Sequence, residues 1–156
     1  MIVRPDQARI YSQGLGEARI LVDGERSGGA WWLGQFREDP GFMTSLHLHD
    51  RTTEYFFVLR GVLSIFLDGK WHDLEAGTAA QIPRGTPHAQ GNTGDQPAIF
   101  VGWGEPAGFE QSFPEIDHLA SQIKPSSADW GPAIAKIISR HDTKVLGPPP
   151  SRLPSP

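Results

Sequence analysis

The feature that most constrains the fold is a regular alternation of short apolar runs with turn residues between Ala18 and Trp103. One separator, Asp68-Gly69, is the strongest short hairpin signal, because both central residues of such a turn need a positive φ. Many short strands at this spacing are typical of a β-sandwich or barrel. The sequence therefore predicts an all-β fold with nine strands, at Ala18–Val22, Ala30–Phe36, Met43–Leu48, Glu54–Leu59, Val62–Leu67, Lys70–Leu74, Ala79–Ile82, His88–Asn92 and Ala98–Trp103.

Composition excludes several classes of protein. The chain has 156 residues, the length of one domain, and no cysteine, so disulfide frameworks, thiolate zinc sites, iron–sulfur clusters and cysteine nucleophiles are ruled out. A net charge of −4 provides no basic stripe for nucleic acid. No apolar run could span a bilayer, and the opening MIVRPDQARI lacks the apolar region of a signal peptide. We expect a soluble, cytoplasmic protein with no nucleic-acid or membrane partner.

The C-terminal third has a different character. Residues Pro114–Ile123 are compatible with a short helix, and Asp129–His141 has an apolar helical stripe. Asp129 can cap this second helix, and the stripe is expected to pack on the barrel. The end, LGPPPSRLPSP, is too rich in proline to build a packed element. We expect a helical extension over residues 114–146 and a Pro-rich tail over 147–156; the stripe consists of Trp130, Ile134, Ile137 and Ile138.

Histidines provide the candidate site. His47 and His49 are two residues apart in a predicted strand, so both rings project from the same face. Glu54 follows after a link long enough to turn the chain, and His88 opens a later strand. Three imidazoles and one carboxylate suit a first-row divalent metal. On spacing alone, ordinary strand histidines remain an alternative explanation.

Two longer motifs carry a resemblance to a known family. Residues 41–61, GFMTSLHLHDRTTEYFFVLRG, fit G-(x)5-H-x-H-(x)4-E-(x)6-G, and residues 77–92, GTAAQIPRGTPHAQGN, fit G-(x)5-P-x-G-(x)2-H-(x)3-N. These resemble the two motifs of the cupin superfamily, in the right order and at the short spacing of small single-domain cupins. The resemblance implies a jelly-roll β-barrel, here over residues 1–113, with His47, His49, Glu54 and His88 as metal ligands.

The resemblance also bears on function. Four protein ligands leave coordination positions open for a substrate or dioxygen, and Fe, Mn, Ni, Co and Zn all accept such ligands. Strand parity places a mostly apolar set beside the ligands. Residues 105–113 and the segment VLGPPP are similar to quercetinase-like cupins, which implies a dioxygenase acting on a small aromatic, enol or phenolic substrate, with Glu54 as catalytic base. The expected substrate pocket comprises Met43, Phe56, Val58 and Gln90.

Two other functions remain open: a metal-dependent isomerase or lyase that needs no dioxygen, and a non-catalytic module that binds a small ligand. Apolar residues at Tyr55, Phe57 and Leu59, opposite the ligand face, indicate that both faces of their strand are buried, either between sheets or in a homodimer. The remaining histidines have no partner pattern and are expected at the surface without a functional role: His72, His118 and His141.

Overall fold

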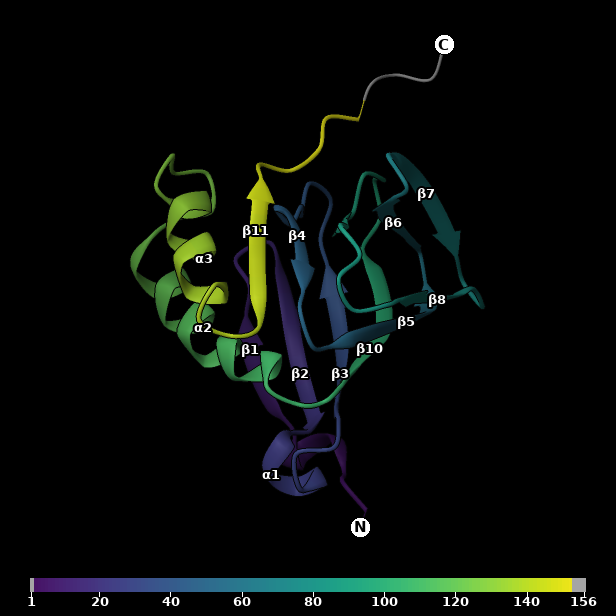
Figure 1. Ribbon diagram of the computed structural model, residues 1–156, viewed down its shortest axis with the longest axis vertical. Coiled ribbons are helices and arrows are strands. Elements are labelled where there is room, and N and C mark those ends of the chain that lie inside the picture. The colour runs from purple at the N-terminus through teal and green to yellow at the C-terminus, as the bar shows by residue number, and fades with distance from the viewer. Residues whose placement is uncertain (1, 153–156) are drawn as a thin grey trace.

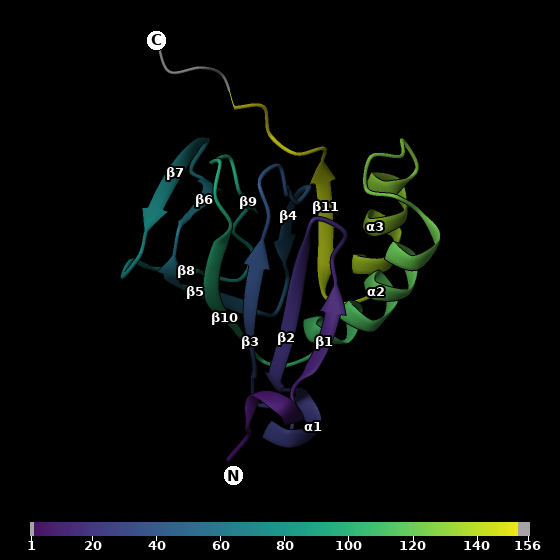
Figure 2. The same ribbon diagram turned by 180° about the vertical axis from the view of Figure 1, so that it is seen from behind.

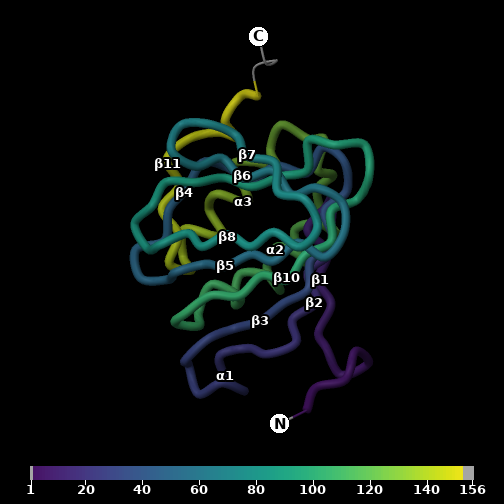
Figure 3. Tube along the Cα trace, turned by 90° about the vertical axis from the view of Figure 1, so that its right-hand side faces the viewer, coloured from purple at the N-terminus to yellow at the C-terminus, as the bar shows by residue number. Residues whose placement is uncertain are grey.

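The computed structural model describes residues 2–152, and residues 153–156 of the predicted tail lie outside this range. Two layers of antiparallel strands face each other and enclose the core (Figures 1 and 3). One layer is a six-stranded sheet, in the order β1 (Arg9–Ser12), β2 (Gly16–Val22), β3 (Trp32–Glu38), β10 (Ala98–Glu105), β5 (Thr53–Arg60) and β8 (Ala79–Ile82).

The opposite layer consists of two smaller sheets. One has the order β7 (Lys70–Glu75), β6 (Val62–Leu67), β9 (Ala89–Gly91), and the other pairs β11 (Thr143–Gly147) with β4 (Leu46–His49). Isolated bridges from His47 to His88 and from Met43 to Gly91 join the two. The result is a jelly-roll barrel, as the sequence predicts.

All nine predicted strands are present, with ends shifted by a few residues. The Asp68-Gly69 hairpin joins β6 and β7, and φ is 52° at Asp68 and 79° at Gly69, as its turn type requires. The motif glycine Gly61 also has a positive φ of 75°, and an added Cβ there would meet the carbonyl oxygen of Pro97 at 2.4 Å. Glycine at this position is therefore a backbone requirement.

Two strands and one short helix were not predicted. Strand β1 is only four residues long and mostly exposed, so its sequence lacks the alternation that marks a half-buried strand. Strand β11 directly precedes the proline run and pairs with β4, so the helical extension expected over residues 114–146 ends inside a barrel strand. Helix α1 (Gly24–Ser27) is a single turn between β2 and β3, capped by the Asp23 side chain on the Arg26 amide.

Helices α2 (Phe113–Gln122) and α3 (Trp130–Ile138) lie side by side next to β1 and β11 (Figures 1 and 2). Of the predicted stripe, Ile137 and Ile138 are buried, whereas Trp130 and Ile134 are half-buried. The predicted cap is wrong: the Asp129 side chain accepts no hydrogen bond from the helix. Its backbone is already helical, with φ −80° and ψ −15°, whereas a capping side chain needs an extended backbone to reach the first-turn amides.

An aromatic cluster fills the barrel between the layers. Strand β3 alternates strictly, with every second residue facing inward. Phe36 stacks on Phe100 with ring centroids 5.2 Å apart, and Trp32 meets Phe113 of α2 edge-on at 6.1 Å. The helical extension thus contributes to the barrel core.

The outer face of β5 is more exposed than the sequence predicts. Phe57 and Leu59 are 39% and 44% exposed, so packing within the chain does not bury both faces of this strand. Tyr55 stacks instead on Trp103 of the neighbouring strand, with centroids 4.8 Å apart. The apolar alternation reflects an open sheet face. Among the described residues, no helix is both long and apolar enough to cross a membrane.

Candidate metal centre

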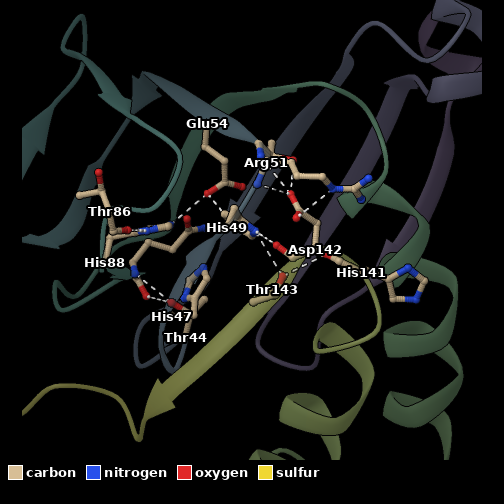
Figure 4. Close-up of polar contacts among 12 residues, drawn as sticks. Thr44, His47, His49, Arg51, Glu54, Thr86, His88, His141, Asp142 and Thr143 are labelled. Carbon is tan, nitrogen blue, oxygen red and sulfur yellow. Dashed lines mark hydrogen bonds and ion pairs between the residues drawn. The ribbon is translucent and has the colours of Figure 1, made fainter.

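The barrel brings His47, His49, Glu54 and His88 together, and all four side chains are buried. His47 and His49 lie on β4, Glu54 begins the inward face of β5, and His88 immediately precedes β9 (Figure 4). The His47 and His88 backbones exchange hydrogen bonds of 2.9 and 2.8 Å, which closes the long sequence separation. One nitrogen or oxygen atom of each residue lies within 4.8 Å of the others.

Backbone carbonyls orient the three imidazoles. The Nδ1 atoms of His47 and His88 lie 2.7 and 2.9 Å from the carbonyl oxygens of Ser45 and Thr86. His49 Nδ1 lies 2.9 Å from the carbonyl oxygen of Asp142 (Figure 4). A carbonyl only accepts, so each Nδ1 carries a hydrogen, and in a neutral imidazole Nε2 then presents a lone pair. This is the arrangement in which outer partners hold histidines for a metal.

The positions of Nε2 test whether these residues fit a metal. Glu54 Oε2 lies 3.2 Å from His49 Nε2 and 3.1 Å from His88 Nε2. If both imidazoles are neutral with the hydrogen on Nδ1, these contacts bring lone pairs together unless a cation lies between them. Among residues 2–152, His49 Nε2 also finds no hydrogen-bond partner of acceptable geometry. The donor set therefore fits a divalent metal.

The electrostatics of the cluster agree with this. Burial, together with smaller effects of His88 and His49 and against the opposing effect of Glu54, lowers the pKa of His47 to about 3, so this imidazole is neutral. Burial alone would lower the pKa of His49, but the Glu54 carboxylate raises it above its usual value. Burial alone would raise the pKa of Glu54, but His49 and His88 hold it well below its usual range. An ionised carboxylate among imidazoles attracts a cation.

Asp142 supports the cluster from the C-terminal segment. It has a positive φ of 53°, which is uncommon outside glycine. While its carbonyl receives His49, its carboxylate accepts hydrogen bonds of 3.0 and 2.8 Å from the amide and hydroxyl of Thr52, and others from Arg51 (Figure 4). The segment before β11 is thereby tied to both the β4–β5 turn and a candidate ligand.

A cavity of about 190 Å³ opens onto His47 and Glu54. Of the predicted pocket residues, Met43, Phe56 and Gln90 line it, whereas Val58 is fully buried in the core away from the wall. Val58 shares the inward face of β5, but the side chains around it fill this part of the barrel, which strand parity does not indicate. Aromatic residues dominate the rest of the wall: Trp32, Phe36, Phe42, Phe100, Phe109, Phe113 and Trp130.

Sequence reasoning missed two residues that contact the site, Glu38 beside Gln90 and Asp142 beside His49. Glu38 is fully buried at the end of β3, and its pKa is raised to about 8 by burial, against a smaller opposing effect of a hydrogen bond from Gln90. Strand parity from Trp32 would have placed Glu38 inward, had the strand been extended by two residues. Asp142 carried no local signal, because its role depends on contacts about ninety residues away in sequence.

The other histidines differ from one another. His118 is exposed and His72 is half-buried. His141 is half-buried, and its Nε2 lies 2.6 Å from Glu115 Oε1 on α2. None of them is part of the ligand cluster, so the structure places no second group of metal donors at these positions within residues 2–152.

Comparison with known proteins identifies the family. Residues 34–103 match the Cupin_2 family model, described as a cupin domain. Quercetin 2,3-dioxygenase of Bacillus subtilis is 32% identical over 88 residues, which are 56% of this chain and 26% of that protein. The tetracenomycin polyketide synthase protein TcmJ of Streptomyces glaucescens is 25% identical over 124 residues, covering 80% of this chain and 81% of that protein.

A solved structure, KdgF from a Halomonas species, has a TM-score of 0.61 at 16% identity and covers 71% of this chain and 97% of that one, which supports the fold alone. The chain spans between about a quarter and a half of the length of several curated relatives that it matches. The barrel, the motif residues and the family-model match agree, and residues 34–103 of this protein form a cupin domain.

Proposed function

We propose that this protein binds one divalent transition metal per chain and acts as a non-haem dioxygenase on a small aromatic, enol or phenolic substrate. One observation carries the proposal. A buried cluster of three histidines and one glutamate adjoins, through His47 and Glu54, a cavity whose wall is rich in aromatic side chains. The residues that would hold a metal therefore lie next to residues that would pack against a flat apolar ring.

His47, His49, Glu54 and His88 would hold the metal through three Nε2 atoms and a carboxylate oxygen. Imidazole and carboxylate ligands suit Fe, Mn, Ni, Co or Zn. A site with thiolate ligands is excluded because the chain has no cysteine. When bound, the metal would polarise the substrate oxygen and provide the open positions at which dioxygen chemistry takes place.

The chain's own groups would bind, orient and deprotonate the substrate. Aromatic side chains on the cavity wall exclude water and pack against a ring. Glu54 lines this cavity, and its low pKa keeps it ionised, so it can accept the proton of a phenol or enol. A carboxylate of low pKa is a weak base, which suits a substrate hydroxyl already made acidic by a metal.

Cavity size limits the substrate. An engineered cavity of about 150 Å³ holds one benzene molecule. The 190 Å³ here accommodates one substituted ring, and a larger molecule would extend toward α3 and Pro149 at the wall. The likeness to a quercetin dioxygenase supports a phenolic substrate with oxygen chemistry. The likeness to a tetracenomycin polyketide synthase protein is consistent with a substrate of the polyketide class.

Oxygen consumption tests the proposal. Protein loaded with Fe(II), Ni(II) or Mn(II) is placed in an oxygen electrode with flavonols, catechols and β-diketones. We expect metal-dependent uptake of one O2 per substrate molecule, both atoms entering the product. Glu54→Gln should lower turnover by about two to four orders of magnitude, the usual contribution of a positioned base. The exposed Glu75→Gln serves as the matched control and should retain full activity.

Other outcomes separate the alternatives. Conversion of substrate without oxygen uptake would replace the dioxygenase with an isomerase or lyase. Metal-dependent binding without any conversion would leave a non-catalytic binding module. Oxygen uptake at the full rate in Glu54→Gln would keep the oxygenase and remove the base.

We also propose a homodimer that covers the open apolar face of β5. Phe57 and Leu59 are the exposed residues that support it. Light scattering at micromolar concentration should give twice the 17.1 kDa mass of one chain. A monomer at that concentration would contradict this assembly.

A further inference from the structure

Gln90 is a polar residue on the cavity wall whose side chain has a buried partner outside the ligand cluster. Its backbone amide donates to Thr44 Oγ1 at 2.9 Å, and its carbonyl accepts from the Thr44 amide at 2.9 Å. Its side-chain Nε2 donates to Glu38 Oε1 at 2.8 Å. Backbone and side chain are therefore both fixed. Within residues 2–152, Gln90 Oε1 accepts no hydrogen bond, so this oxygen is left for a molecule in the cavity.

Glu38 determines which way the Gln90 amide points. Its side chain has no exposed surface, and the Asn92 side chain fixes its backbone carbonyl at 2.8 Å. No cation pairs with it in the described part of the chain, and Oε2 has no partner. An unpaired charge is costly in such a place, so Glu38 is a neutral acid at pH 7, consistent with its raised pKa. Its Oε1 then remains the acceptor that holds Gln90 Nε2.

The extended segment that runs from His88 into β9 sets the distance between Gln90 and the metal centre. His88 and Gln90 are two residues apart and face the same side of an extended segment, so they are about 7 Å apart along it. One substituted benzene ring spans a similar distance. A ring with oxygen atoms at the metal centre would present its opposite edge to Gln90.

We propose that Gln90 Oε1 recognises a hydroxyl group of the ligand, on the edge of the ring opposite the metal-directed oxygens, and that Glu38 is the positioning residue that aims this oxygen. The inference rests on the proposed function in one respect, that a phenolic ligand occupies this cavity. The proposed contact with Gln90 limits the ligands to aromatic or enol compounds that chelate the metal at one edge and carry a hydrogen-bond donor at the opposite edge. A site with a fixed acceptor disfavours an isostere that lacks the hydroxyl, because the acceptor is then left unpaired.

A matched pair of probes tests this contact without turnover. The probes are 4-(hydroxymethyl)catechol and 4-ethylcatechol, which differ by a hydroxyl in place of a methyl group. Their affinities are measured by calorimetry without oxygen on Zn(II)-loaded protein, since Zn(II) has no redox chemistry. The quantity compared is the ratio of the two affinities in each variant, which cancels general losses of binding.

Relative to Gln90→Leu, we expect the wild-type ratio to favour the hydroxymethyl probe by about three- to tenfold, the contribution of one hydrogen bond. Glu38→Leu should shift the ratio toward that of Gln90→Leu, and Glu38→Gln should restore it, since an amide oxygen can still accept from Gln90. Gln13→Leu is the control, because Gln13 lines the same cavity without a buried partner in the described residues. Thermal melting verifies that each variant is folded, and Gln90→Met replaces Gln90→Leu if the latter is unfolded.

Each result has a distinct meaning. An equal ratio in wild type and Gln90→Leu, with both probes bound, overturns the inference and leaves the proposed function intact. A wild-type ratio in Glu38→Leu overturns the positioning role. Failure of both probes to bind overturns the inference together with the phenolic substrate class.

Discussion

Replacing Glu38 with glutamine should stabilise the protein at alkaline pH and remove one source of its pH dependence. Glu38 is fully buried, Gln90 donates the one hydrogen bond that its side chain accepts within the described residues, and burial raises its pKa from 4.5 to about 8. The nearest charges in sequence, Arg37 and Asp39, pair with each other at 2.6 Å. They therefore do not compensate an ionised Glu38.

The direction of the effect follows from proton linkage. Between pH 4.5 and about 8, the unfolded chain has released the Glu38 proton and the folded chain retains it. The free energy of unfolding therefore falls as pH rises, by about 1.4 kcal/mol per pH unit for one proton. Below pH 4.5 the stabilisation is fully present, and above about pH 8 it is lost. From pH 5 to pH 9, wild type should lose about 4 kcal/mol relative to Glu38→Gln, which cannot ionise.

Urea denaturation of chelator-treated wild type and Glu38→Gln, at intervals from pH 5 to pH 9, measures this difference. Subtracting the two curves removes the contributions of all other titrating groups. Exposed Glu75→Gln is the control and should follow wild type throughout. A constant difference between wild type and Glu38→Gln across this range would refute the reasoning, since Glu38 would then titrate normally.

Three further predictions concern the C-terminal third. Asp142→Ala should lower metal affinity by about ten- to a hundredfold, because the Asp142 carboxylate anchors, through Thr52 and Arg51, the segment whose backbone carbonyl orients His49, while Asp142→Asn keeps most of that anchoring; equal metal titrations of the two variants would contradict this. Ile134→Asp should lower the free energy of unfolding by about 1–3 kcal/mol, since Ile134 is half-buried on the cavity wall, and an unchanged melting temperature would show that it tolerates a charge. Truncation after Gly147 should lower the free energy of unfolding by less than about 1 kcal/mol, because the Arg152–Asp73 ion pair that it removes is at the surface. Loss of folding in the truncated protein would show that the tail is structural.

The barrel was largely predictable because its information is local. Turn chemistry and alternation locate nine strands, and the positive φ at Asp68 and Gly69 is what the Asp-Gly pair favours. Strand β11 was not predictable in the same way. Its residues, TKVLG, precede a proline run, and only pairing with β4 makes them a strand. Its existence depends on tertiary context.

The candidate site was likewise predictable where its information is local and unpredictable where it depends on tertiary packing. Strand parity places Met43 and Phe56 beside the histidines, and the structure puts both on the cavity wall. Parity could not show that Val58 is enclosed by other core residues, or that Phe57 is exposed. The role of Asp142 arises from chain segments that meet only in the folded protein. Sequence patterns assign a face to each residue, and packing decides what covers that face.

The central claim is that His47, His49, Glu54 and His88 form one metal site. Elemental analysis of protein purified without a chelator or a histidine tag tests it most directly, with His47→Ala/His49→Ala as the comparison and circular dichroism to verify folding. The account predicts about one equivalent of a divalent transition metal per wild-type chain and none in the folded double variant. A wild-type protein that holds no metal after titration with Fe(II), Mn(II), Ni(II), Co(II) and Zn(II), or a double variant that retains its metal at full occupancy, would contradict it.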